Sequence, residues 1–172
     1  TQKRNTRYST QEHYDCASAF QKSLRGSDAN AAIYYLAKMI EAGEDPRFIA
    51  RRLIVCAAED VGLADPNAMN IAVNAYRAVE IIGLPEGRIP LANAVVYVAN
   101  APKSNKIIMA IDKALADIES GKDFPPPMHL RDAHYKDAKK YGFGEGYIYT
   151  HAAPDIEQQF MPDELIDVKY LE

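Results

Sequence analysis

Apolar residues recur at every third or fourth position through the first two-thirds of the chain, which predicts a series of amphipathic α-helices. Most of these stripes have Ser or Asp just before them and Gly just after them, the residues that cap and end helices. We therefore predict six helices, which run from Ser9 to Gly26, from Ser27 to Gly43, from Asp45 to Gly62, from Asp65 to Gly83, from about Pro90 to Ala101 and from Ser104 to Gly121.

Three of the helix starts carry specific capping signals. Ser9 and Glu12 have the S-x-x-E spacing of a capping box. Asp-Pro pairs at 45–46 and 65–66 put a proline at the first helical position, where its missing N–H costs nothing. The aspartate of each pair can accept a backbone N–H of the first turn, so we expect both aspartates to cap their helices.

The segment at residues 90–101 contains the run AVVYVA, which could be mistaken for a strand. Its apolar residues also fit helical spacing, and its neighbours are helical, so a helix is favoured. A helix that is apolar around most of its circumference must be buried, either in the centre of the domain or between subunits. The second alternative gives a candidate subunit interface of Leu91, Val95, Val96 and Val98.

The connections between these helices are only a few residues long, so sequential helices should pack as hairpins. Residues 11–121 are thus predicted to form a compact all-α bundle of about six helices, and residues 1–10 to be a linker from an upstream module. After residue 121 the pattern changes to three consecutive prolines, one short helix over about residues 131–140, and a Gly- and Tyr-rich stretch. This extension, residues 122–172, is too aromatic for a disordered tail, so we expect it to lie on the bundle or on a partner, and favour the bundle.

Composition limits the classes of protein that the chain can belong to. Its 172 residues are 48% hydrophobic and 26% charged, which suits a soluble globular domain. A net charge of −4 argues against a dedicated nucleic-acid binder but leaves local basic patches open. Cys16 and Cys56 lie in helical stripes without C-x-x-C spacing, which indicates small buried side chains in a reducing compartment. Without an apolar run that could span a bilayer or a signal peptide, we expect a cytoplasmic or nuclear protein.

The sequence lacks the familiar catalytic motifs. It has no P-loop, and the glycines between residues 142 and 146 give only G-x-G-x-G without a following helix to hold phosphate. His129 and His134 are five residues apart and do not share a helical face, so no metal site is expected. A small hydrolase using His134 and Asp132 would lack a nucleophile. We expect no catalytic residue and no bound cofactor in this chain.

Two groups of charged residues remain as candidates for function. The first lies in the third predicted helix, where two arginines precede two acidic residues by about two turns and can share its flank. A structural ion-pair network is the favoured interpretation, and contact of an arginine with a partner subunit or nucleotide is the alternative. The four residues are Arg51, Arg52, Glu59 and Asp60.

The second group lies in the C-terminal extension and combines cations with aromatic side chains. A solvated surface is the simpler interpretation, and a surface for a partner protein or for the phosphates of DNA is the alternative. The residues are Arg131, Lys136, Lys139, Lys140, Tyr141, Phe143, Tyr147 and Tyr149.

Several long blocks occur in a fixed order along the chain, among them FIARRL, AEDVGLADP, HLRDAHYK and QQFMPDEL. From about residue 12 to residue 165, these blocks make the chain closely resemble the C-terminal region of the replication-associated recombination protein A family. Members of this family are AAA+ ATPases, also called MgsA or RarA, and are similar to the eukaryotic Werner-helicase-interacting protein.

This resemblance implies a helical domain like the collar of clamp-loader subunits, which assembles the protein into a homotetramer. It implies that ATP and magnesium bind in an upstream module, so that this chain is the non-catalytic part of a DNA-dependent ATPase. It also implies work at stalled replication forks in replication, recombination and repair, with DNA and single-stranded-DNA-binding protein as partners. The location would be the bacterial cytoplasm, at the nucleoid, or the nucleus of a eukaryote. The alternative is a monomeric helical adaptor that binds a partner protein or DNA.

Overall fold

The computed structural model describes residues 8–172 and has no β-strand in that range. The predicted all-α class is therefore confirmed. The predicted linker at residues 1–10 lies mostly outside the described residues. The α-helices are α1 (Thr10–Arg25), α2 (Ala29–Glu41), α3 (Pro46–Cys56), α4 (Asn67–Ile82), α5 (Arg88–Asn100) and α6 (Lys106–Glu119).

The helices begin close to where the capping residues predict. At the start of α3, the Asp45 side chain accepts the backbone N–H of Arg47 at 2.9 Å. Asp65 accepts the N–H of Asn67 in the same way at the start of α4, at 3.1 Å. Each carboxylate satisfies a donor that the first turn of a helix leaves without an intrahelical partner. The predicted Asp45 cap is confirmed, whereas at α4 Pro66 occupies the N-cap position and Asp65 bonds the first helical N–H from one residue earlier.

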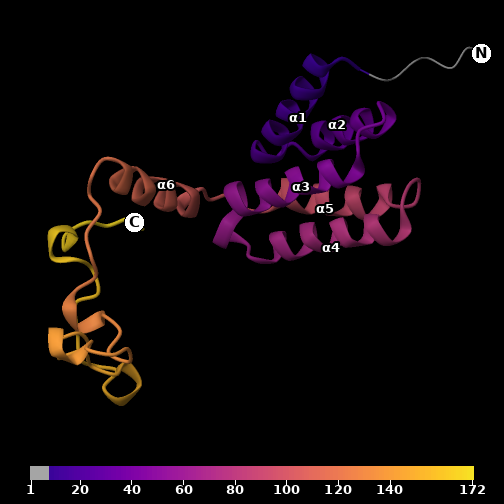
Figure 1. Ribbon diagram of the computed structural model, residues 1–172. Helices are drawn as coiled ribbons and strands as arrows, with labels where there is room; N and C mark the ends of the chain where they lie inside the picture. Colours follow the sequence, from indigo (N-terminus) through magenta and orange to yellow (C-terminus); the bar gives the residue numbers. More distant parts are fainter. Residues whose placement is uncertain (1–7) are drawn as a thin grey trace, which may run out of the picture. The chain divides into compact units, whose positions relative to one another are not determined.

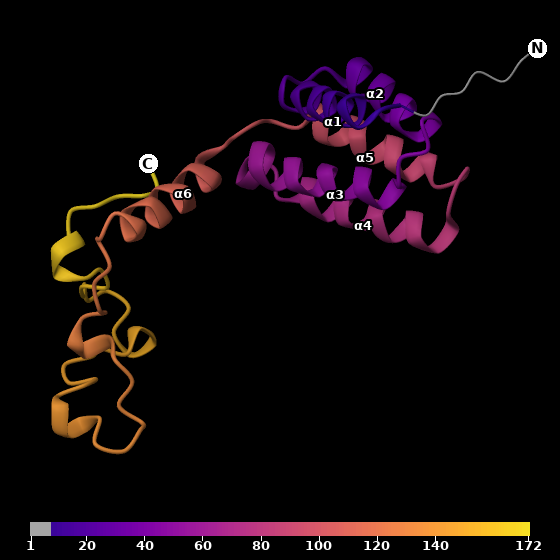
Figure 2. The ribbon, with the colours of Figure 1, turned by 45° about the horizontal axis from the view of Figure 1, so that its top comes forward.

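Helices α1 to α5 form one unit that ends at Met109, called the helical unit below. Sequential helices pack against one another, with the most extensive contacts between α1 and α2 and between α4 and α5, as short connections require. Helix α5 contacts each of α1, α2, α3 and α4 and lies among them (Figures 1 and 2). The last helix in sequence is therefore the central helix of this unit.

The central position of α5 explains why its sequence is apolar on nearly every side. Its helical conformation is confirmed, and Leu91, Val95 and Val98 have no exposed surface. The predicted subunit interface is wrong for these three residues, because the other helices of the same chain already cover them. Val96 is 37% exposed and is the member of that set that can still contact another molecule.

The second unit, Ala110–Glu172, contains most of α6 and is called the C-terminal unit below. After α6 it is built from turns, with short 3₁₀ segments at Met128–Leu130, Lys139–Tyr141, Thr150–Ala152 and Asp163–Leu165. The prediction that residues 122–172 lie on the bundle stays a prediction.

The short helix predicted over residues 131–140 is wrong. The Asp132 side chain accepts the backbone N–H of His134 at 2.9 Å, a local hydrogen bond that competes with helix formation. Asp137 has a φ of 68°, in the left-handed region, which a right-handed helix excludes. Two aspartates thus replace the expected helix with turns.

Candidate interaction surfaces

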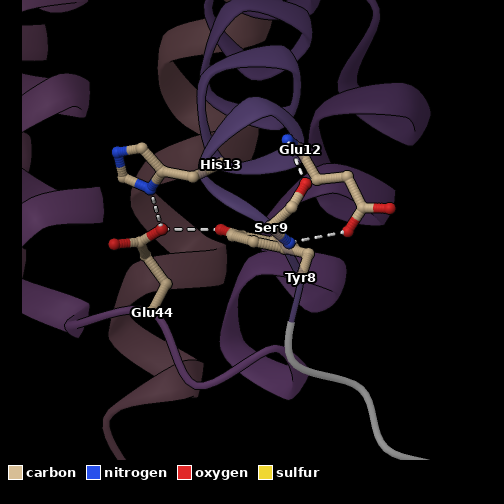
Figure 3. Close-up of polar contacts among 5 residues, drawn as sticks. All are labelled: Tyr8, Ser9, Glu12, His13 and Glu44. Carbon is tan, nitrogen blue, oxygen red and sulfur yellow. Dashed lines mark hydrogen bonds and ion pairs between the residues drawn. The ribbon is translucent and has the colours of Figure 1, made fainter.

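A polar cluster ties the start of α1 to the joint between α2 and α3 (Figure 3). The Tyr8 hydroxyl donates to Glu44 Oε2 at 2.6 Å, and His13 Nδ1 donates to the same oxygen at 2.5 Å. Burial of Tyr8, and then its hydrogen bond to Glu44, raises the pKa of the phenol, so the hydroxyl remains a donor. Beside it, Ser9 and Glu12 form the predicted capping box, each side chain accepting the other's backbone N–H. The cluster fixes where the chain enters the helical unit.

Helix α3 continues past Cys56 as one π-helical turn, Ala57–Val61. Asp60 in this turn is buried, and its carboxylate accepts Arg25 Nε at 2.8 Å and Cys56 Sγ at 3.2 Å. A buried carboxylate is costly unless donors satisfy it, and here α1 and α3 each supply one. The hydrogen bond to Asp60 raises the pKa of Arg25, and burial followed by the bond to Asp60 raises the pKa of Cys56 to about 12. At neutral pH both groups are therefore in their donor forms.

The four residues of the predicted ion-pair network do not come together. Asp60 pairs with Arg25 of α1 and not with either arginine of α3. In the part of the chain that the structure describes, no salt bridge joins Arg51 or Arg52 to Glu59 or Asp60. The physical reason is distance: residues seven to nine positions apart are separated by about 10–14 Å along a helix, and direct side-chain pairs form at three or four positions. The pair that does form joins residues 35 apart, for which no local sequence pattern exists.

Hydrogen bonds hold the connection between α5 and α6 at the C-terminal end of α5, next to Asp60. Lys103 Nζ donates to Ser27 Oγ at 3.0 Å and to two carbonyl oxygens at the end of α5. The Ser104 N–H donates to the Asp60 carbonyl oxygen at 2.7 Å. Gly62 allows this close approach, because it has a φ of 53° and a Cβ there would lie 3.3 Å from the Ser104 carbonyl oxygen. The chain is thus fixed in place as far as Ser104.

An open groove of about 430 Å³ runs between α1 and α3. Three cations, Lys22, Arg25 and Arg52, line it, and none of its lining residues is a carboxylate. Arg52 Nη2 donates to Gln21 Oε1 at 2.5 Å, which joins α3 to α1 within this groove. Tyr14, another lining residue, is 63% exposed. The remaining lining residues are His13, Ala17, Ser18 and Phe48. No local sequence pattern marks this groove, because its cations come from two helices that only the fold brings together.

The predicted partner surface in the C-terminal unit is only partly a cluster. The Arg131 guanidinium lies over the Phe143 ring, 5.1 Å from its centroid, and its Nε donates to the Pro126 carbonyl oxygen at 2.9 Å. The Tyr141 ring lies 5.9 Å from the Phe143 ring. Arg131 therefore serves to hold this loop as well as to add charge. The exposed members of the set are Lys136, Lys139, Lys140, Tyr141, Tyr147 and Tyr149.

The C-terminal unit buries little of its own apolar surface. Among its residues, all of which the structure describes, only Ala110 and Ala138 are buried. Helix α6 carries Ile111, Leu115 and Ile118 along one stripe, each about half exposed. Contiguous apolar surface of this kind marks an interaction site in a soluble protein.

Two features bear on a possible chemical centre: clusters of metal-ligating side chains and the His134–Asp132 pair. Within residues 8–172, no group of three or more His, Cys, Asp and Glu side chains is placed to hold a metal ion. His134 and Asp132, the pair of the hydrolase hypothesis, lie 2.7 Å apart, but the His134 side chain is 96% exposed. Backbone and side-chain hydrogen bonds from His134 lower the pKa of Asp132, which is a surface effect without a shielded site around it. Across the same residues, every helix is too short or too polar to cross a membrane.

Residues 26–172 match the family described as "MgsA AAA+ ATPase C terminal". The chain is 56% identical over 160 residues to Replication-associated recombination protein A of Bacillus subtilis, covering 92% of this chain and 38% of that protein. It is 42% identical over 163 residues to the protein of the same name from Escherichia coli K12, covering 91% and 36%. It is 40% identical over 162 residues to ATPase WRNIP1 of Dictyostelium discoideum, covering 92% and 18%. The chain thus spans little more than a third of the length of these two bacterial relatives.

The fold defines an all-α domain with open surface grooves between its helices. The chain belongs to the MgsA AAA+ ATPase C-terminal family, as the resemblance in its sequence implies.

Proposed function

We propose that this chain is the self-association domain of a AAA+ ATPase that acts in replication-associated recombination, and that it assembles into a homotetramer. Membership of the MgsA C-terminal family, and relatives named for replication-associated recombination, support the first part. In this proposal ATP, magnesium and the ATPase reaction belong to the rest of the parent protein, as does its action on DNA at stalled forks. Single-stranded-DNA-binding protein is its expected partner there.

The apolar surface of the C-terminal unit is the observation that carries the self-association proposal. A unit that buries only two alanines cannot stabilise itself through its own core, because core burial is the main favourable term in folding. Its apolar side chains must therefore be covered from outside the unit. A second copy of the chain is present wherever the first copy is, and a closed symmetric oligomer covers the same surface in every copy.

Light scattering of the 172-residue chain over a range of concentrations tests this proposal. We expect a mass of about four times the 19.1 kDa of one chain at micromolar concentration. A mass of one chain at high micromolar concentration would refute self-association and favour the monomeric adaptor.

The groove between α1 and α3 supports a second candidate function, contact with single-stranded nucleic acid. Its cations suit phosphates, and the exposed Tyr14 ring offers a stacking surface for a base. Fluorescence anisotropy with a labelled single-stranded oligonucleotide measures this contact. Tyr14→Ala should weaken binding about tenfold, and Lys22→Ala should reduce the salt dependence by about one phosphate contact.

Matched controls for these two variants lie on α2. Tyr34 is 60% exposed, close to the exposure of Tyr14, and Lys38 is an exposed lysine outside the groove. Tyr34→Ala and Lys38→Ala should leave binding unchanged. If binding is instead lost on substitution of Lys139 and Lys140, the nucleic-acid contact belongs to the C-terminal unit.

A further inference from the structure

A second groove, of about 450 Å³, lies between α2 and α5 and is mostly apolar. Its α2 wall presents Ile33, Ala37 and Ile40 at positions i, i+4 and i+7, which fall on one helical face. Its α5 wall presents Ile89, which is 53% exposed, and Ala92. The other lining residues are Leu36, Glu41, Arg88 and Asn93. A mostly apolar groove between two helices is the kind of surface that binds the apolar face of a third helix.

Helix α6 has such a face. Ile111, Leu115 and Ile118 have the same i, i+4, i+7 spacing as the α2 wall, and each is about half exposed. The end of the chain does not cover this stripe. It binds the other side of α6, where the Tyr170 hydroxyl donates to Asp117 Oδ2 at 2.8 Å. Lys113, on that side as well, donates to a carbonyl of the chain end at 3.1 Å.

The charges beside the two apolar surfaces are complementary. Arg88, the cation of the groove lining, is exposed at one end of the groove. Asp112 and Glu119 are exposed next to the first and last residues of the α6 stripe. Docking of α6 can therefore bring a carboxylate to Arg88 while the apolar side chains are buried, and Glu41, the carboxylate of the lining, belongs to the α2 wall.

We propose that α6 of one copy of this chain binds in the α2–α5 groove of a second copy. This inference rests on the proposed self-association and names the surfaces that it uses. Each copy carries both the helix and the groove, so two copies related by a two-fold axis form both contacts at once. A closed ring of four copies, in which each α6 enters the groove of the next copy, also satisfies every groove and matches the proposed tetramer.

The path of the chain favours a second copy over the groove of the same copy. Lys103 and Ser104 are held at the C-terminal end of α5, by bonds to Ser27 and Asp60. The groove lies along the N-terminal half of α5. Only Asn105 lies between the fixed segment and the start of α6, and one residue is fewer than helix–helix reversals ordinarily need.

Disulfide trapping between two single variants tests the contact directly. Ala37→Cys places a thiol in the groove, and Leu115→Cys places one in the α6 stripe. Mixed and oxidised, the two variants should give a covalent dimer on a non-reducing gel. Ile81→Cys replaces Ala37→Cys as the control, because Ile81 is 81% exposed on α4 and outside the groove. The two native cysteines are buried and should not interfere.

Equal trapping with Ile81→Cys, or no trapping with Ala37→Cys, would overturn the contact. The double variant Ala37→Cys/Leu115→Cys distinguishes a contact between two copies from a contact within one copy. If it oxidises to a product with the mass of one chain, α6 occupies the groove of its own copy, and the inference fails.

A charge placed in the groove separates this inference from the proposed function. Ile89→Asp should raise the dissociation constant of self-association at least about tenfold, because it buries an unpaired carboxylate in the interface. Ile81→Asp should leave the constant unchanged. If the chain self-associates and Ile89→Asp does not weaken it, the groove contact is refuted while self-association stands. If the unsubstituted chain is monomeric, both proposals fail.

Discussion

Asp60 is the one buried charged residue in the part of the chain that the structure describes. Its carboxylate is tolerated because Arg25 and Cys56 both donate to it, from α1 and from α3. Through its backbone carbonyl, the same residue also holds Ser104 at the start of the connection to α6. Asp60 thus joins three separate segments, α1 and α3 through its side chain and the α5–α6 connection through its backbone, from its place in the π-helical turn.

Neither cysteine should react with Ellman's reagent in the folded protein at about pH 8. Burial raises the pKa of Cys16, and burial together with the bond to Asp60 raises the pKa of Cys56 to about 12. Because only the thiolate is nucleophilic, both thiols should react with the reagent no faster than the protein unfolds. Both should react at once in denaturant, which is the control. Fast reaction of one thiol without denaturant would contradict the burial described here.

The raised pKa of Cys56 also predicts a pH dependence of stability. Because the pKa is about 12 in the folded protein and 9.0 in an unperturbed thiol, the stabilisation is complete below about pH 9 and is lost as pH rises toward 12. Urea unfolding at about pH 8 and about pH 10.5 measures the effect. The unsubstituted chain should lose more free energy of unfolding between these values than Cys56→Ala. Equal losses would show that the thiol does not contribute.

At the scale of elements, the Asp-Pro pairs start two helices and α5 organises the rest. The caps are local, since each aspartate bonds a backbone N–H two residues ahead. The position of α5 is not local, since it depends on contacts with four other helices. Substitution of a buried residue in α5 should therefore lower the free energy of unfolding more than removal of a helix cap.

Removal of either cap should cost about 1 kcal/mol of unfolding free energy, because a helix N–H loses its acceptor. Asp45→Ala and Asp65→Ala test this by urea unfolding. Glu80→Ala removes an exposed carboxylate near the end of α4 that caps no helix start, and should change stability by less than about 0.5 kcal/mol. The helix starts would be misplaced if all three variants were equally stable.

Leu91→Ala should cost about 2–5 kcal/mol, because Leu91 is fully buried in the core and its truncation leaves a cavity. Val96→Ala should cost about 0.5 kcal/mol, since Val96 is partly exposed. The same urea experiments compare the two variants. A stable Leu91→Ala variant with altered oligomeric mass would instead place Leu91 in an interface between copies.

At the scale of the whole molecule, the chain combines a unit with a well-packed core and a unit with almost none. If self-association covers the second unit, its backbone amides should become more protected from hydrogen exchange as protein concentration rises. The core helices α3 and α4, which do not line the α2–α5 groove, should exchange at a rate that does not change. Mass spectrometry of exchanged peptides at two concentrations measures both, and protection of α6 independent of concentration would contradict assembly through this unit.

The sequence by itself determined the helices of the helical unit and their starts, because caps and apolar periodicity act between residues a few positions apart. It failed over residues 131–140, where side-chain hydrogen bonding and a left-handed aspartate outweigh a weak helical pattern. The family membership could be inferred from the sequence alone, since the family model matches residues 26–172. The tertiary structure was needed to show that Leu91, Val95 and Val98 form core and not interface, that Asp60 pairs with Arg25, and that the α1–α3 and α2–α5 grooves exist. Each of these depends on which helices meet, and periodicity along one helix shows which face is apolar but not what covers it.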